Sequence, residues 1–299
     1  MSETDQIEWI AADWGTSRLR VWAMRGREVL ARATSDKGMG RLDRDGFEPA
    51  LREACVGWPV DRVPVVACGM VGSRQGWTEA RYGIVPAPPL APQFAHPDSA
   101  LDVHIIPGLN QDAPADVMRG EETQIAGLLA REPAFNGVVC LPGTHTKWAQ
   151  VSAGEVVSFR TAMTGELFDL LTAQSILRHS TDSDNWAAAA FEEAVADTIS
   201  RPEDLATRLF RIRAETLLLG LEPGPARARL SGLLIGAELA AVKPYWLGQD
   251  VAIVGAEALS AHYETALALQ GVTARRFDAT ETTLAGLAAA YQTLTGDRT

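Results

Sequence analysis

The sequence has few of the features that would place the protein outside the cytoplasm or on nucleic acid. It contains three cysteines, Cys55, Cys68 and Cys140, and the last two lie in apolar strand-like runs, so we expect buried, reduced thiols. Charged residues or prolines interrupt every apolar run before about 18 residues, which argues against a membrane-spanning helix. The net charge is −11 and no basic run reverses it, which makes nucleic acid a poor partner. We therefore expect a cytoplasmic protein without membrane or nucleic-acid partners.

Several common catalytic motifs are also missing. Neither G-x-x-x-x-G-K-[ST] nor G-x-G-x-x-G occurs, which argues against a Walker-type phosphate loop and a dinucleotide fold. There is no G-x-S-x-G elbow of a serine hydrolase and no histidine and cysteine spacing typical of a zinc site. What is present is a globular composition, with 46% hydrophobic and 22% charged residues over 299 positions, enough for two domains sharing a cleft.

A strand-turn-strand pattern occurs twice. Residues 9–12 form an apolar run that ends at Asp13 and a Trp-Gly-Thr turn, and strand character resumes at 19–22. Residues 138–141 are followed by a Pro-Gly-Thr turn and a second strand at 147–151. The two Gly-Thr pairs lie about half the chain apart, which favours a duplicated domain. Further strands expected at 63–68, 103–106 and 251–254 alternate with helical segments, as in α/β proteins.

The first turn carries groups suited to a metal-bound phosphate. Asp13 offers a carboxylate for a hydrated Mg²⁺ ion, while Gly15, Thr16 and Ser17 offer backbone and hydroxyl donors. An ordinary Asx-type hairpin would explain the same residues.

The second turn repeats these properties. It supplies several backbone N–H groups, two hydroxyls and a cation from Gly143, Thr144, His145, Thr146 and Lys147. A third turn at Gly255 opens a helix whose N-terminus would face an adenosine or an α-phosphate.

These strings resemble a known superfamily. Asp13-Trp14-Gly15-Thr16-Ser17 is similar to the first phosphate motif of the acetate and sugar kinase, heat-shock 70 and actin superfamily, Gly143–Lys147 is similar to its second, and Gly255 stands where its adenosine motif would be. The helices expected at 121–130 and 282–291 resemble its two connecting helices. The resemblance implies two ribonuclease H-like α/β domains of the duplicated actin-like type, with ATP and Mg²⁺ in a central cleft.

Longer strings resemble one family within it. Residues 13–20, 69–77, 118–124, 141–148 and 159–166 are similar to the 2-dehydro-3-deoxygalactonokinase family. This implies ATP-dependent phosphorylation of 2-dehydro-3-deoxy-D-galactonate at its terminal (6-) hydroxyl, in D-galactonate catabolism. Residues 1–120 would form an N-terminal lobe with the first phosphate motif and the sugar-acid site. Residues 121–299 would form a C-terminal lobe with the other motifs, and a helix at about 280–295 would cross back to the N-terminal lobe.

Phosphoryl transfer needs charge neutralisation and a group that accepts the hydroxyl proton. Asp13 is expected to hold Mg²⁺, and Arg18 and Lys147 to stabilise the transferred charge. We favour Glu121 as the general base, and Glu122, Glu166 and Asp169 remain alternatives.

The substrate's carboxylate calls for a cation with a forked geometry. Arg74 in the glycine-rich stretch 72–76 is the first candidate and Arg119 the second, with Glu166 as a further substrate contact. The alternative for Arg74 and Arg119 is that they are solvated loop arginines without a ligand. The alternative for Glu121 is that it only stabilises the N-terminus of its helix.

Two rival functions share this scaffold. Phosphate-binding turns and a carboxylate would also serve a polyphosphate or phosphate-ester hydrolase. A nucleotide-switched sugar-binding regulator is the second rival. The preferred epimer and the oligomeric state, including a homodimer, stay open.

Overall fold

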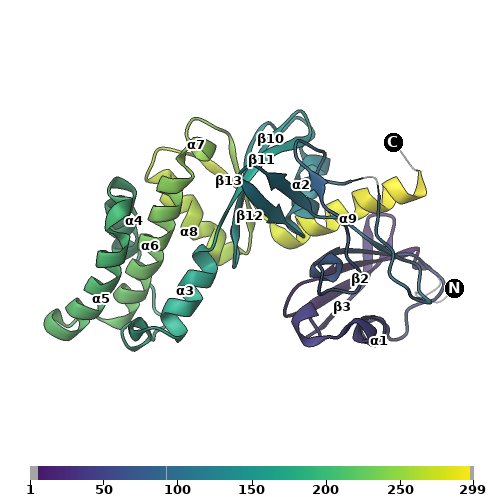
Figure 1. The fold of residues 1–299 in the computed structure, drawn as a ribbon, viewed down its shortest axis with the longest axis horizontal. Helices are drawn as coiled ribbons and strands as arrows, with labels where there is room; N and C mark the ends of the chain where they lie inside the picture. The colour runs from purple at the N-terminus through teal and green to yellow at the C-terminus, as the bar shows by residue number, and fades with distance from the viewer. Residues whose placement is uncertain (1–5, 92, 297–299) are drawn as a thin grey trace. The chain divides into compact units, whose positions relative to one another are not determined.

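The computed structural model describes residues 6–91 and 93–296, which group into two compact units (Figure 1). The first unit takes in the chain up to Asn136, residues 151–158 and the C-terminal helix from Ala279 onward. The second takes in residues 137–150 and 159–278. The division into lobes at 120/121 stays a prediction.

The first unit contains a five-stranded sheet. Its strands are β1 (Trp9–Trp14), β2 (Leu19–Arg25), β3 (Glu28–Ser35), β4 (Val65–Gly69) and β6 (Val103–Ile105), in the order β3-β2-β1-β4-β6. β1 is antiparallel to β2, and β2 to β3, whereas β4 is parallel to both β1 and β6. β1 and β4 are almost entirely buried, as expected for central strands covered on both faces. Asp13 therefore lies at the carboxyl end of a central strand.

Helices cover both faces of this sheet. On one face Trp14 packs against α1 (Phe47–Ala54), with its ring centroid 5.0 Å from that of Phe47. On the other face the strands pack against α9 (Ala279–Thr295), where Trp9 stacks on Tyr291. The alternation of strand side chains thus fills two apolar layers.

α2 (Glu121–Arg131) crosses α9 at two glycines. A Cβ atom on Gly127 would lie 1.8 Å from the carbonyl oxygen of Thr282, and one on Gly286 would lie 1.9 Å from that of Thr123. Neither distance is compatible with a side chain, so the two helix backbones are in direct contact. This crossing holds the N-terminus of α2 at a defined place in the first unit.

A second five-stranded sheet repeats this strand order. Its strands are β9 (Gly137–Leu141), β10 (Thr146–Ser152), β11 (Glu155–Ala162), β12 (Val251–Gly255) and β13 (Ala274–Asp278), in the order β11-β10-β9-β12-β13. β12 is parallel to both of its neighbours, β9 and β13. β9 and β12 occupy the places that β1 and β4 hold in the first sheet. Both sheets thus have the ribonuclease H-like order, which confirms the duplicated α/β fold expected from the sequence.

The helices of the second unit are α3 (Thr164–Ala173), α4 (Ala188–Ser200), α5 (Leu205–Leu219), α6 (Pro223–Ala241), α7 (Lys243–Trp246) and α8 (Glu257–Ala268). α6 is buried on several sides: Ile235 joins the core next to the sheet, and Leu230 joins a second cluster with residues of α4 and α5. A Cβ on Gly232 would lie 2.4 Å from the carbonyl oxygen of Phe191, so α4 packs closely on α6. Two polar residues of α6, Ser231 and Glu238, are buried as a result.

Smaller elements complete the described structure. They are a three-stranded sheet of β5 (Gly83–Ile84), β7 (Leu109–Asp112) and β8 (Ala115–Met118), and short 3-10 helices at Met39–Arg41, Arg44–Gly46, Met70–Gly72, Ile176–His179 and Pro202–Asp204. Cys55, Cys68 and Cys140 are buried and unpaired, as expected. Within residues 6–91 and 93–296, none of the helices is both long and apolar enough to cross a bilayer.

Candidate active site

The first phosphate-type turn joins β1 to β2. The N–H of Gly15 donates to the carbonyl oxygen of Arg18 over 2.9 Å and closes the turn. Thr16, Ser17 and Arg18 are exposed, so the hydroxyls and the guanidinium of the turn are accessible to a ligand.

Residues 38–40 pack against this turn and hydrogen-bond to it. The N–H of Gly40 donates to the carbonyl oxygen of Thr16 over 2.9 Å. A Cβ on Gly38 would lie 2.2 Å from the carbonyl carbon of Ser17, so a side chain there would displace the turn. The shape of the turn therefore depends on a glycine more than twenty positions further along the chain.

Asp13 is paired with a cation. Its carboxylate accepts a hydrogen bond from the guanidinium of Arg20, which lies directly opposite it in the β1–β2 ladder. The side chain of Asp13 is 15% exposed, so the carboxylate is mostly buried but still accessible to a small ligand. Arg20 was not singled out from the sequence, although its place in the hairpin could have identified it.

Two glycines bring the start of α2 to the end of β1. A Cβ on Gly69, whose φ is +88°, would lie 2.7 Å from the carbonyl oxygen of Trp14 and 3.4 Å from Oδ1 of Asp13. A Cβ on Gly120, whose φ is +106°, would lie 3.4 Å from Cα of Gly69. Both conformations favour glycine. Glu121 and Glu122, which follow Gly120, therefore lie in the same region as Asp13.

Glu121 and Glu122, the first two residues of α2, occupy different environments. Glu121 is half-buried, and its Oε2 accepts a hydrogen bond from the N–H of Arg119 at 2.9 Å. Glu122 is fully buried and accepts hydrogen bonds from the N–H of Gly120 at 2.6 Å and from Oγ1 of Thr123 at 2.9 Å. Glu121 is therefore the more accessible acid for a substrate proton.

Burial and the neighbouring charge of Glu121 raise the pKa of Glu122 to about 7. The pKa of Cys68 is also raised, first by burial and then by the charges of Asp13 and Glu122. These two carboxyl groups therefore act on the same buried sulfur, which places them in one region of the first unit.

The two candidate arginines differ in accessibility. The side chain of Arg74 is 80% exposed and makes a long ion pair of 3.5 Å with Glu79. The guanidinium of Arg119 instead lies over the ring of Tyr82 at 4.3 Å and donates to the carbonyl oxygen of Ala80 at 2.9 Å. Its Nε and Nη1 atoms are buried without a hydrogen-bond partner in the described part of the chain. Arg74 is thus free to move towards a ligand, whereas Arg119 is held by its packing.

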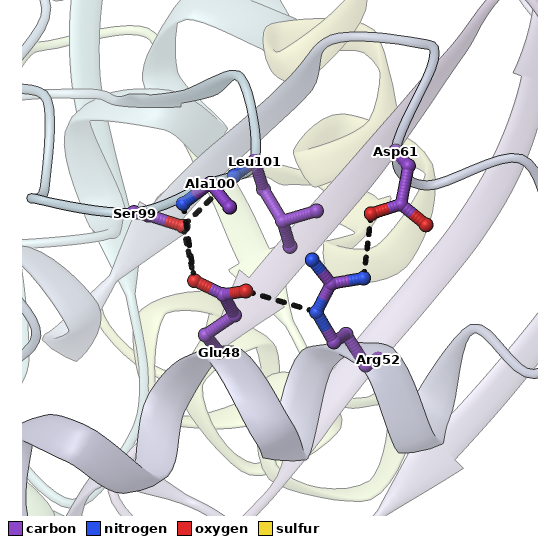
Figure 2. A network of polar contacts seen from close by, with 6 residues as sticks. All are labelled: Glu48, Arg52, Asp61, Ser99, Ala100 and Leu101. Atoms are coloured by element: carbon purple, nitrogen blue, oxygen red, sulfur yellow. Dashed lines mark hydrogen bonds and ion pairs between the residues drawn. The ribbon is translucent and has the colours of Figure 1, made fainter.

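A network on α1 borders a surface cavity of about 370 Å³ in the first unit. Glu48 accepts hydrogen bonds from Ser99 and Arg52, and Arg52 also pairs with Asp61, as Figure 2 shows. The bond from Ser99 is the main cause of the lowered pKa of Glu48. The cavity is lined by Arg44, Asp45, Glu48, Pro49, Arg52, Trp77 and Asp98. The cavity holds three acids and two arginines, and Arg52 is already paired with Glu48 and Asp61. Its charges therefore do not favour the binding of an anionic sugar.

The second phosphate-type turn joins β9 to β10 and is bound to the first turn of α3. The N–H of Glu166 donates to the carbonyl oxygen of Thr144 at 2.9 Å, and the carboxylate of Glu166 contacts Nε2 of His145 at 2.5 Å. A Cβ on Gly165 would lie 2.2 Å from the carbonyl oxygen of Gly143. The structure thus brings together His145 and Glu166, which the sequence assigned to different ligands.

The last two residues of this motif point into the second unit. Thr146 is fully buried, and its Oγ1 lies 2.9 Å from the hydroxyl oxygen of Tyr263. Lys147 is 6% exposed and donates from Nζ to Oγ1 of Thr161 on β11 at 2.8 Å. Lys147 is therefore much less accessible than a lysine at the tip of a phosphate loop would be.

A cavity of about 410 Å³ opens at the carboxyl ends of the parallel strands β9 and β12. It is lined by Gly143, Thr144, Thr164, Gly165, Phe168, Asp169, Trp186, Arg227, Ser231, Leu234, Ile235, Ala258, Leu259, His262 and Tyr263. Ligands of open α/β sheets bind at such strand ends. Gly255 ends β12 just before α8, and a Cβ there would lie 2.8 Å from Oγ of Ser260 and 3.3 Å from Cδ of Pro142. Gly255 therefore allows β9, β12 and α8 to meet closely beside the cavity.

Aromatic rings form part of the cavity wall. Trp186 stacks on His262 with ring centroids 4.0 Å apart and an interplanar angle of 19°. Burial lowers the pKa of His262, so the imidazole is neutral near pH 7. The guanidinium of Arg227 lies over the ring of Phe168 at 4.9 Å. None of these four residues was chosen from the sequence, because no local motif marks them.

Comparison with known proteins places the chain in a family. The family model described as 2-keto-3-deoxy-galactonokinase matches residues 13–290. The 2-dehydro-3-deoxygalactonokinase of Escherichia coli (strain K12) is 37% identical over 268 residues, which cover 88% of this chain and 90% of that protein. A Rhizobium meliloti (strain 1021) protein, provisionally named as a 2-dehydro-3-deoxygalactonokinase, is 42% identical over 297 residues. The match covers 95% of this chain and 96% of that protein.

Solved structures agree with this result. The crystal structure of a Sinorhizobium meliloti protein, provisionally described as a 2-dehydro-3-deoxygalactonokinase, has a TM-score of 0.90 at 42% identity and covers 96% of this chain and 99% of its own. Component A of the (R)-2-hydroxyglutaryl-CoA dehydratase of Acidaminococcus fermentans has a TM-score of 0.52 at 14% identity, with 97% and 98% covered, and shows the shared fold alone. The chain belongs to the 2-keto-3-deoxy-galactonokinase family.

Proposed function

We propose that this protein transfers the γ-phosphoryl group of ATP to the terminal (6-) hydroxyl of 2-dehydro-3-deoxy-D-galactonate, as a step of D-galactonate breakdown. The proposal rests on one observation above all: a family match over residues 13–290 that includes both phosphate-type turns. Each turn occupies the same place in its own sheet, after β1 and after β9. Fold alone would not carry this assignment, because the same fold hosts several chemistries.

The nucleoside of ATP is assigned to the 410 Å³ cavity of the second unit. Gly143 and Thr144 are among its lining residues, so a nucleotide inside would have the second turn within reach of its phosphates. The stacked pair of Trp186 and His262 offers an aromatic face for the base.

Mg²⁺ is assigned to Asp13. Within the described residues there is no cluster of three or more His, Cys, Asp or Glu side chains that would enclose a metal. This fits Mg²⁺, which usually keeps several waters and binds through one or two carboxylates together with substrate phosphates. The ion would neutralise charge on the phosphate oxygens. Arg20, which pairs with Asp13, would hold this carboxylate in a fixed orientation.

Glu121 is assigned as the group that accepts the proton of the 6-hydroxyl. It is supported by its accessibility at the start of α2, compared with the fully buried Glu122. Glu122, Glu166 and Asp169 remain alternatives. Arg18 and Lys147 would stabilise the transferred charge, although the burial of Lys147 favours a role through Thr161.

Arg74 is assigned to the carboxylate of the sugar acid. Its exposed guanidinium offers the forked geometry that binds a carboxylate through two parallel hydrogen bonds. Arg119 is the weaker choice because Tyr82 and Ala80 already hold its guanidinium. Glu166 stays a candidate for a sugar hydroxyl.

A coupled assay of ADP release tests this function. We expect ADP to be released in proportion to the sugar acid added, with the galacto epimer preferred over the gluco epimer. Release of inorganic phosphate without the sugar acid would indicate a hydrolase. Tight ATP binding without turnover on any sugar acid would indicate a regulator. We also propose a cytoplasmic location, where ATP is available and the three unpaired cysteines would stay reduced.

A further inference from the structure

We propose that Glu238, a buried carboxylate on α6, is a positioning residue that connects the second phosphate turn to α3 and to the wall of the nucleotide cavity. This inference rests on the assignment of ATP to that cavity. No catalytic step assigned above uses Glu238, and it lies more than ninety positions from the turn in the sequence.

Glu238 lies on α6 and is 5% exposed. Its Oε1 accepts a hydrogen bond from Nε1 of Trp148 at 2.7 Å. Its Oε2 accepts hydrogen bonds from the hydroxyl of Tyr263 at 2.9 Å and from Oγ1 of Thr164. All three donors are themselves buried. A single carboxylate thus satisfies polar groups of three other elements.

Each donor leads to the nucleotide site. Trp148 lies on β10, and Tyr263 on α8 both lines the cavity and contacts Oγ1 of Thr146, a residue of the phosphate motif. Thr164 lines the cavity as the first residue of α3 and precedes Glu166, whose N–H donates to the carbonyl oxygen of Thr144. The network therefore reaches the phosphate motif by two routes, through Tyr263 and through the start of α3.

The energetics favour a specific role over packing. Burying a carboxylate costs free energy unless it is well hydrogen-bonded, and an apolar core here would need neither the carboxylate nor the three buried donors that it pairs with. Burial raises the pKa of Glu238, and the bonds from Thr164, Trp148 and Tyr263 act in the opposite direction. The pKa of Tyr263 is raised well above its usual value, mainly by burial, so its hydroxyl keeps the proton that it donates. The carboxylate thus holds Tyr263 and Thr164 in one orientation towards the cavity.

The test compares Glu238→Leu with Glu238→Gln. We expect Glu238→Leu to raise the Kd for ATP by about 10-fold to 100-fold, because small displacements of positioning groups have effects of this size. The KM for the sugar acid should change less than about twofold. Glu238→Gln keeps one carbonyl acceptor at the same place and should recover most of the affinity. Nucleotide affinity is measured by isothermal titration calorimetry, which does not depend on turnover.

Two further variants keep the proposal testable if Glu238→Leu does not fold. Tyr263→Phe and Thr146→Val each remove one side of the same contact, and their effects on ATP affinity should be strongly non-additive in the double variant. Glu215→Gln is the matched control, because Glu215 is paired with Arg229 away from the cavity and should leave ATP affinity unchanged.

A folded Glu238→Leu protein with wild-type ATP affinity would overturn the inference, as would strictly additive effects in the double variant. Failure of the proposed function would look different: the unmodified protein itself would bind no ATP, or would release no ADP with the sugar acid.

Discussion

Asp13 and Arg20 face each other across the β1–β2 ladder, and their carboxylate and guanidinium form an ion pair beside the first phosphate turn. The pair gives a carboxylate that is only 15% exposed a charged partner. It also means that a metal at Asp13 would share the carboxylate with Arg20. Arg20 therefore belongs to the assigned metal site together with Asp13.

Asp13→Asn should reduce kcat by about 100-fold, because the neutral amide binds the divalent ion more weakly and cannot neutralise its charge. The measurement is steady-state ADP release at several Mg²⁺ concentrations. Asp36→Asn, an exposed acid paired with Arg41, is the control and should leave kcat unchanged. A wild-type kcat in Asp13→Asn would remove Asp13 from the mechanism.

Arg74→Ala should raise the KM for the sugar acid by about tenfold while leaving the KM for ATP unchanged, because a charge-assisted contact to the carboxylate is lost. Arg74→Lys should restore only part of the affinity, since lysine lacks the fork. Arg81→Ala, at an exposed arginine further along the chain, is the control. Equal effects of Arg74→Ala and Arg81→Ala would argue against a site at Arg74.

Trp186→Ala should raise the KM for ATP by about tenfold, the effect expected from loss of one stacking surface of about 1–3 kcal/mol. Trp186→Phe should retain most of the affinity. Phe210→Ala is the control, because Phe210 is an exposed aromatic residue of α5 outside the cavity. Unchanged ATP affinity in Trp186→Ala would place the base elsewhere.

Gly127→Ala should lower the free energy of unfolding by about 3 kcal/mol, because its Cβ would collide with the Thr282 carbonyl oxygen at 1.8 Å. Urea unfolding followed by circular dichroism measures the change. Ala130→Ser, on the exposed side of the same helix, should stay within about 0.5 kcal/mol of wild type. A Gly127→Ala protein as stable as this control would contradict the close helix crossing.

Glu122 should make the stability depend on pH. Its pKa is about 7 in the folded protein against an ordinary value of 4.5, so the folded state keeps a proton that the unfolded state has lost. Stability should therefore fall as pH rises from 4.5 to about 7, by roughly 3 kcal/mol, and then stay level. Glu122→Gln should flatten this part of the profile in urea unfolding. An unchanged slope would mean that other groups cause it.

Local patterns predicted the parts of the fold that depend on neighbouring residues. The strands expected at 63–68, 103–106 and 251–254 correspond to β4, β6 and β12, and the helices expected at 121–130 and 282–291 lie within α2 and α9. Short apolar runs ending in Gly-containing turns are strong local signals. The repeated motif also predicted a duplicated domain, and both sheets have the same strand order.

Contacts between distant residues were out of reach of such patterns. Glu238 contacts Trp148, ninety positions away, and no spacing rule connects the two. Arg74 is exposed and Arg119 is enclosed. Both arginines stand in loop-like sequence, so the sequence pattern could not distinguish them and only the packing did.

The sequence by itself determined the α/β class, the two phosphate-type turns and the family, because short runs of adjacent residues are enough to identify each of them. Only the tertiary structure decided that His145 pairs with Glu166, that Lys147 is buried against Thr161 and that Trp186 faces the cavity. The physical reason is that burial and hydrogen bonding depend on which elements meet in space, and that is settled by the packing of the whole core.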